Sequence, residues 1–192
     1  MFKVTSAWKS AFPEAYAGVL VMRDVVNPVH QPELEKHKIE LEEKIRSQFS
    51  GQDRAAMSNH PILQAYNSYY RRFKKTYHVQ LQLESIAWKD KSIPSVSALV
   101  EAMFMAEMKN MLLTAGHDLD VLHLPLTLDA SNGTESYTLM RGSEQILKAG
   151  DNEHQRQRGH CLKHCVWSRP ANADHGCNTQ CAVYRLRSCW DQ

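Results

Sequence analysis

The pattern of hydrophobic and polar residues divides the chain into three parts. Residues 2–6 and 18–25 are short apolar runs, and they predict two strands separated by a turn-rich loop at 7–17. Residues 32–113 follow the helical period and predict four helices. From Gly116 onward the apolar positions alternate again, which predicts a second group of strands.

The four predicted helices cover residues 32–49, 61–75, 79–88 and 96–113. The first carries one apolar stripe among glutamates and lysines, and this stripe consists of Leu34, Leu41, Ile45 and Phe49. Ser95 is placed to cap the last helix. That helix is apolar on nearly every side, so we expect it to be central and buried. Its methionines are expected to fill the core rather than to bind a ligand.

The order of strands, helices and strands predicts an α+β domain, which we place at residues 1–159. The 192 residues are 43% hydrophobic and 23% charged, with a formal charge of +2, which neither favours nor excludes a nucleic-acid partner. No apolar run reaches the roughly 18–20 residues that span a bilayer, and the N-terminus lacks the apolar segment of a signal peptide. We therefore expect a cytoplasmic protein without a membrane partner.

Charged residues gather where the last predicted helix gives way to strands. His117, Asp118 and Asp120 could together position a water for hydrolysis or bind an amine. In the structural alternative, Asp118 caps a turn and Asp120 pairs with a cation such as Arg141. Arg141 and Glu144 either line the same pocket or form a surface ion pair, which would contribute little to stability.

Residues 69–78, YYRRFKKTYH, interleave basic and aromatic side chains. The cations are Arg71, Arg72, Lys74 and Lys75. Such a segment is typical of surfaces that contact phosphates and stacked bases. The alternative is a helix whose aromatic face packs inward while the cations are merely solvated. This inward face would consist of Tyr66, Tyr70 and Phe73.

Two blocks of the chain resemble a known family: SIPSVSALVEAMFMAEMKNMLLTAGHDLDVL at 92–122 and YTLMRGSEQI at 137–146. They are similar to the editing and tRNA-binding (B-three/B-four) domain of the bacterial phenylalanyl-tRNA synthetase β subunit. The likeness is closest to the stand-alone proteins that carry this domain alone, and it covers residues 18–150. The resemblance implies a layered α+β domain with a β-sandwich-like sheet and helices packed on one side.

The resemblance also implies an activity, because this domain of the synthetase hydrolyses tyrosine wrongly attached to phenylalanine tRNA. Asp118 and Asp120 match the paired aspartates of the family, and Glu144 matches an acidic position of the following strand. The expected partners are an aminoacyl-tRNA or an amino-acid-like small molecule, with no cofactor. We expect the substrate to contact His117, Asp118, Asp120, Arg141 and Glu144.

The chain departs from the family at three positions of the editing pocket. The synthetase carries a Thr-Asn pair and a histidine there, and this chain carries Met103, Phe104 and Ala115. These apolar residues favour the alternative function, a non-catalytic module that binds RNA or a small molecule.

The last segment, residues 160–192, holds every cysteine of the chain. These are Cys161, Cys165, Cys177, Cys181 and Cys189. Together with His164 and His175 they could ligate zinc, although the spacing is unusual. Reading suitable codons one base later instead gives a strand-rich string that resembles the end of the family's domain. We therefore expect a frame-shifted, irregular and poorly ordered tail that supplies no closing strands and holds no structural zinc.

Overall fold

The computed structural model describes residues 2–13, 15–118, 125–138, 144–155, 161–162 and 181–188. The helices are α1 (Ser6–Ala11), α2 (Pro32–Gln48), α3 (Arg54–Ser58), α4 (Pro61–Arg71), α5 (His78–Lys89) and α6 (Ala98–Asn110). The strands are β1 (Phe2–Val4), β2 (Ala15–Val21), β3 (Thr114–Asp118), β4 (Leu126–Ala130), β5 (Ser136–Thr138), β6 (Glu144–Ile146), β7 (Asn152–Gln155), β8 (Cys161–Leu162) and β9 (Cys181–Ser188).

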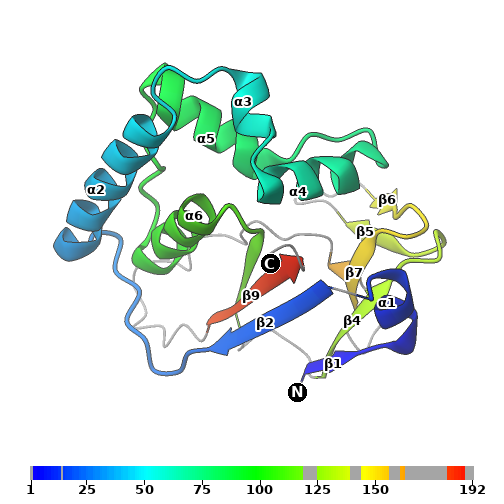
Figure 1. Ribbon diagram of the computed structural model, residues 1–192. Coiled ribbons are helices and arrows are strands. Elements are labelled where there is room, and N and C mark those ends of the chain that lie inside the picture. The colour runs from blue at the N-terminus through cyan, green and yellow to red at the C-terminus, as the bar shows by residue number, and fades with distance from the viewer. Residues whose placement is uncertain are drawn as a thin grey trace.

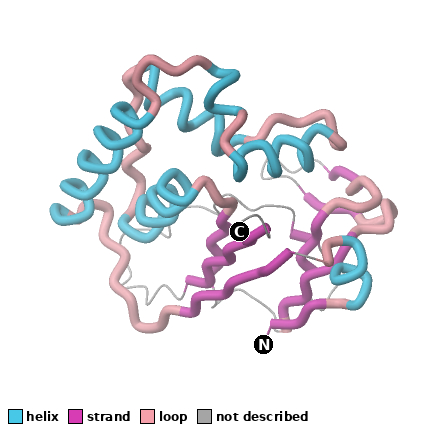
Figure 2. Tube along the Cα trace, viewed as in Figure 1, coloured by secondary structure: helices cyan, strands magenta, loops and turns pink. Residues whose placement is uncertain are grey.

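The predicted α+β class is confirmed, with the long helices grouped between two sets of strands along the chain. Helices α2, α3, α5 and α4 form an outer arc, and α6 lies between this arc and the sheet that contains β2 (Figures 1 and 2). The described strands form three sheets, with the orders β1-β4-β7-β8, β2-β9-β3 and β5-β6. Strand β1 runs parallel to β4, and the other described pairs are antiparallel.

Helix α1 occupies part of the segment that the sequence predicted to be a loop. Thr5 is its N-cap, with a hydroxyl that accepts from Trp8 N at 3.1 Å and donates to Asp129 Oδ1 of β4 at 2.6 Å. Trp8 is buried. A helix of six residues is marginal by itself, so this cap and the contact with a strand more than 120 residues away explain why local sequence did not reveal it.

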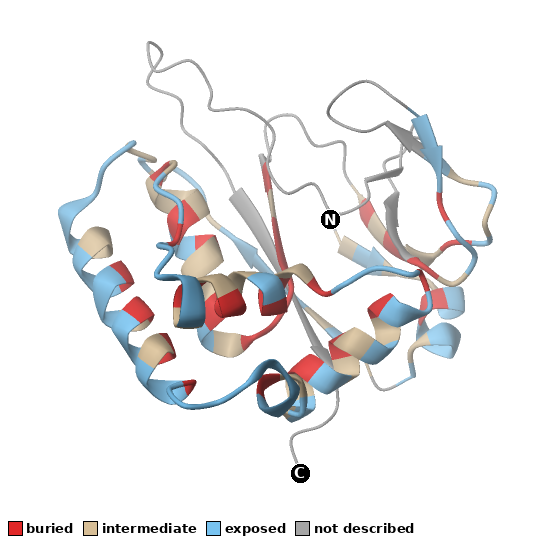
Figure 3. Cartoon of the chain, turned by 90° about the horizontal axis from the view of Figure 1, so that it is seen from above, coloured by how far each residue is buried: buried red, intermediate tan, exposed pale blue. Residues whose placement is uncertain are grey.

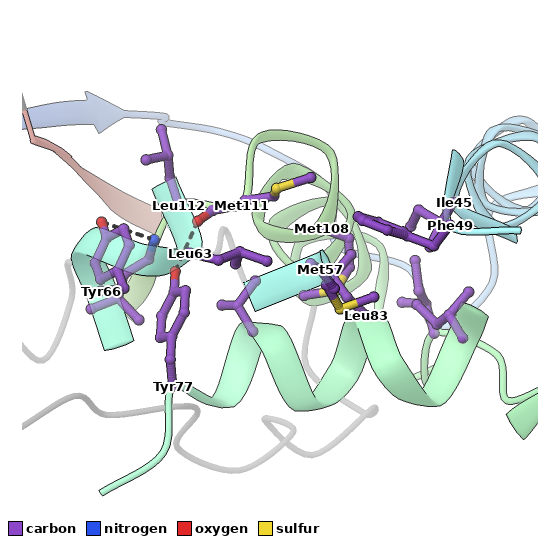
Figure 4. Close-up of a cluster of buried hydrophobic side chains, with 14 of the residues drawn as sticks. Ile45, Phe49, Met57, Leu63, Tyr66, Tyr77, Leu83, Met108, Met111 and Leu112 are labelled. Carbon is purple, nitrogen blue, oxygen red and sulfur yellow. Dashed lines mark hydrogen bonds between the residues drawn. The ribbon is translucent and has the colours of Figure 1, made fainter. Parts of the chain in front are cut away.

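The main core lies between the outer helices and α6. The buried residues of the helices lie mainly on the sides that face the interior (Figure 3), and many of the buried hydrophobic side chains come together in one cluster (Figure 4). Ile45 and Phe49 of the predicted α2 stripe belong to this cluster. Met108 and Met111 are also buried in it, which confirms that these methionines fill the core.

A cluster of ionic and polar groups, centred on the buried Lys38, joins α2 to α6 and to the segment before it. Lys38 Nζ lies 2.6 Å from Glu35 Oε1, 3.2 Å from Glu101 Oε2 and 2.6 Å from Ser95 Oγ; we call these four residues the Lys38 clasp. Burial alone lowers the pKa of Lys38, but its hydrogen bonds with Glu35 and Glu101 outweigh burial, so the pKa is raised. Glu101 Oε1 also accepts from Val96 N at 2.9 Å. The predicted capping role of Ser95 is therefore wrong: Ser97 is the N-cap, and Ser95 belongs to the clasp.

Strand β9 lies between β2 and β3 and pairs antiparallel with both, so that Ala15 is opposite Ser188 and Thr114 is opposite Arg185. Strand β8 pairs with β7. The expectation that the segment after Gly159 adds no strand is therefore wrong for β8 and β9. The rest of 160–192 lies outside the described residues, and its frame-shifted origin stays a prediction.

The reason for this correction is visible in the pattern of residues 181–188, CAVYRLRS. Tyr184 and Leu186 alternate with the basic residues Arg185 and Arg187, which is the period of a strand. Without a central strand, β2 and β3 would each present unpaired backbone groups along one more edge. The cysteine-rich surroundings of this short run concealed it from the sequence analysis.

The clasp makes a testable prediction about stability. Lys38→Met leaves the buried Glu101 carboxylate without its cation, and removing one partner of a buried pair costs about 3–5 kcal/mol of unfolding free energy. The double variant Lys38→Met with Glu101→Gln should recover part of this loss. Urea unfolding followed by circular dichroism measures both. Lys36→Met, which removes an exposed lysine of the same helix, is the control and should stay close to the wild type. A Lys38→Met variant as stable as this control would refute the role of the clasp.

Candidate functional site

Three stacked tyrosines determine where the candidate site lies. The ring centroids of Tyr66 and Tyr77 are 4.3 Å apart with an interplanar angle of 9°, and those of Tyr70 and Tyr77 are 5.4 Å apart. Tyr77 Oη donates to the Met111 carbonyl at 3.0 Å, and Tyr66 Oη accepts from Leu113 N at 3.3 Å (Figure 4). The tyrosine stack therefore fixes α4, the start of α5 and the connection from α6 to β3 to one another.

Burial also sets the chemistry of these phenols. It is the main cause of the raised pKa values of Tyr70 and Tyr77, and nearby groups including Glu107 add to it. Both hydroxyls therefore stay protonated and uncharged over the physiological range. Tyr77 can accordingly act as the hydrogen-bond donor that its contact with Met111 requires.

The stack places the predicted basic segment at the surface. Tyr66, Tyr70 and Phe73 are buried, which confirms that the aromatic face packs inward. After α4 ends, Phe73 N bonds to Tyr70 O and Lys74 N to Arg71 O, and Lys74 has a φ of 55°, so the chain reverses here. The four cations lie on the outside of this reversal, and all are exposed. We call Arg71, Arg72, Lys74 and Lys75 the basic surface.

Three contacts connect this surface to neighbouring residues. The Arg72 guanidinium lies over the Tyr69 ring, 4.9 Å from its centroid, and 5.7 Å from that of Phe73. Lys148, from the connection between β6 and β7, donates to the Phe73 carbonyl at 3.4 Å and adds a cation that the sequence analysis missed. Within the described part of the chain, neither Arg71 nor Lys74 takes part in an ion pair.

The predicted group around His117 is described only in part. His117 is a buried residue of β3, and the backbone of Asp118 pairs with Cys181 of β9. Glu144 begins β6, where it is exposed and pairs with Thr138. It thus belongs to a different sheet from His117. Asp120 and Arg141 lie outside the described residues, so the proposed pocket stays a prediction.

Three residues that the sequence resemblance aligned with an editing pocket belong to the packed interior. Met103 and Ala115 are buried, and Phe104 is partly buried and packs against the main core cluster. These side chains present apolar surface to their surroundings, so the expected pocket has no hydrogen-bonding group at these three positions.

The structure reveals a second polar group that the sequence analysis missed. Glu107 of α6 is 2% exposed, and its Oε1 accepts from Thr114 N at 2.8 Å and lies 4.0 Å from His78 Nε2. We call Glu107, Thr114 and His78 the Glu107 cluster. Its signal in the sequence was a single carboxylate in the apolar run AMFMAEM at 102–108. A carboxylate in such a run is unusual unless it has a partner.

The described residues include no group of three or more histidine, cysteine or acidic side chains arranged to hold a metal ion. Cys161 and Cys181 lie in different sheets, and Cys165, Cys177 and Cys189 are outside the described ranges. Over the same ranges, no helix combines the length and the apolar character needed to cross a membrane.

Comparisons with known proteins add no relative. No family model matches the chain, and neither a curated protein nor a solved structure matches it.

Proposed function

We propose that this protein is a stand-alone tRNA-binding, editing-like domain that recognises an aminoacyl-tRNA or the amino acid attached to it. The observation that carries the proposal is the basic surface, whose four cations are exposed on one hydrogen-bonded chain reversal. The resemblance to the phenylalanyl-tRNA synthetase domain supports tRNA as the nucleic acid. Lys148 extends the positive charge from a second part of the chain.

The burial of the aromatic residues in the segment 66–73 determines which parts of an RNA the basic surface can contact. Tyr66, Tyr70 and Phe73 are buried and therefore do not stack on bases. The surface offers instead cations that contact phosphates, which gives binding that depends little on sequence and strongly on salt.

Neutralising two cations tests this proposal. The double variant Arg71→Gln, Lys74→Gln should weaken tRNA binding and lower the slope of log K against log salt by about 1 for each phosphate that the protein no longer neutralises. Fluorescence anisotropy with labelled tRNA at several salt concentrations measures both quantities. The matched control is Lys36→Gln, Lys44→Gln, which removes the same charge from exposed positions of α2.

Equal weakening by the two double variants would show that only net charge matters and would reject the basic surface as the binding site. Wild-type protein that binds tRNA without salt dependence would contradict the proposal as well.

The proposed function has two forms, an editing enzyme and a binding module without chemistry, and hydrolysis of the aminoacyl ester distinguishes them. An editing enzyme needs a positioned water, and His117, beside Asp118, is the described residue best suited to act as its general base. The second candidate function is a module that binds RNA or a small molecule without chemistry. The apolar residues Met103, Phe104 and Ala115 favour it.

For the editing form, we expect phenylalanine tRNA charged with tyrosine to lose its amino acid faster than the uncatalysed background. His117→Asn should slow this reaction by about 10²-fold or more, since that is the typical contribution of a general base. The measurement is release of labelled tyrosine over time. Salt-dependent tRNA binding with no release above background would reject the enzyme and support the non-catalytic module.

A further inference from the structure

We propose that the Glu107 cluster binds an ammonium group, and specifically the α-ammonium of the amino acid carried by the tRNA. The choice of this ligand rests on the proposed function. The cluster itself is defined by contacts that do not depend on that function.

The charge of Glu107 is the first reason to expect a cation. The described contacts of its carboxylate are one hydrogen bond, from Thr114 N, and His78 Nε2 at 4.0 Å. An ionised carboxylate can accept about four hydrogen bonds, and burying one without a cation is costly. Two other buried carboxylates are paired with a cation of the chain: Glu101 with Lys38, and Glu84 with Arg54 at 2.8 Å. Glu107 is therefore suited to a cation that comes from a ligand.

Two polar atoms of the residues that contact Glu107 give the second reason. Thr114 is 8% exposed, and its Oγ1 has no hydrogen-bond partner among the described residues; the same holds for His78 Nε2. The 4.0 Å between His78 Nε2 and Glu107 Oε1 is too long for a direct hydrogen bond. A third group can bridge this distance at about 2.8 Å to each atom.

An ammonium group matches these acceptors. It has three donors and one positive charge. The carboxylate of Glu107, the hydroxyl of Thr114 and the imidazole of His78 in its neutral form can each accept one of them. A carboxylate ligand would instead be repelled by Glu107.

The position of His78 suggests how a ligand reaches the cluster. The His78 side chain is 33% exposed, whereas that of Glu107 is 3% exposed, so part of the His78 ring lies at the outer side while its Nε2 atom is buried. His78 follows Lys75 by three residues and begins α5 directly after Tyr77 of the stack. The basic surface and the Glu107 cluster are thus connected by one short segment of the chain. We expect a tRNA bound at the basic surface to place its aminoacylated end at the Glu107 cluster.

Calorimetric titration with phenylalaninamide tests the proposal, because this amide keeps the ammonium group and has no ester to be hydrolysed. N-acetylphenylalaninamide, which lacks the ammonium group, is the matched ligand control. We expect the wild type to bind the first at least 10-fold more tightly than the second. Glu107→Gln should weaken binding of the first by about 10- to 100-fold, since it replaces the charged acceptor of the ammonium group by a neutral amide oxygen.

Two further variants distinguish loss of the ammonium site from loss of the fold. Thr114→Val keeps the shape of the side chain and the backbone N–H, and should weaken binding several-fold. Glu84→Gln neutralises another buried carboxylate and should leave binding unchanged. Failure of the wild type to bind phenylalaninamide, equal binding of the acetylated ligand, or equal losses in Glu107→Gln and Glu84→Gln would each overturn the proposal.

The two proposals fail separately. Glu107→Gln should bind uncharged tRNA like the wild type, since the basic surface is intact. If tRNA binding depends on Arg71 and Lys74 but no ammonium ligand binds, the present inference is wrong and the proposed function stands. If phenylalaninamide binds through Glu107 but tRNA does not bind, the inferred ammonium site stands and the tRNA function is wrong.

Discussion

The packing of Tyr77 between Tyr66 and Tyr70 is the interaction on which the remaining structure depends. Through its rings the stack joins α4 to the start of α5, and through two hydroxyls it holds the backbone at Met111 and Leu113. Offset aromatic pairs contribute about 0.5–1.5 kcal/mol each beyond the area that they bury. The same residues that stabilise the interior therefore also fix the basic surface on the outside and the Glu107 cluster alongside.

The Lys38 clasp also fixes helices to one another, here α2 to α6 and to the segment before α6. Apolar packing alone would allow α2 to shift along α6, because such contacts have little directionality. The hydrogen bonds of Lys38 and Glu101 do have direction, and so does the bond from Ile93 N to Glu42 Oε1 at 2.7 Å. Together they fix the segment between α5 and α6 against α2. Glu42 and Lys38 lie on the same side of α2 as the apolar residues Ile45 and Phe49.

Local sequence predicted the features that depend on local spacing. The period of 3.6 residues identified α2 and α5 almost to their ends, and the alternation after Gly116 predicted the later strands. Prediction failed where distant residues decide. The capping hydroxyl of α1, that of Thr5, is held by Asp129, and β9 depends on two strands far away in the chain. Glu107 was missed because its neighbours in sequence are apolar and its polar contacts come from α5 and β3.

The tyrosine stack connects the basic surface on the outside to the buried carboxylate of Glu107. Amide hydrogen exchange, measured with and without tRNA, tests this connection most directly. We expect slower exchange on tRNA addition at residues 69–78 and 107–117, with little change in α2. Protection confined to α2 or α3, with none at residues 69–78, would contradict the connection.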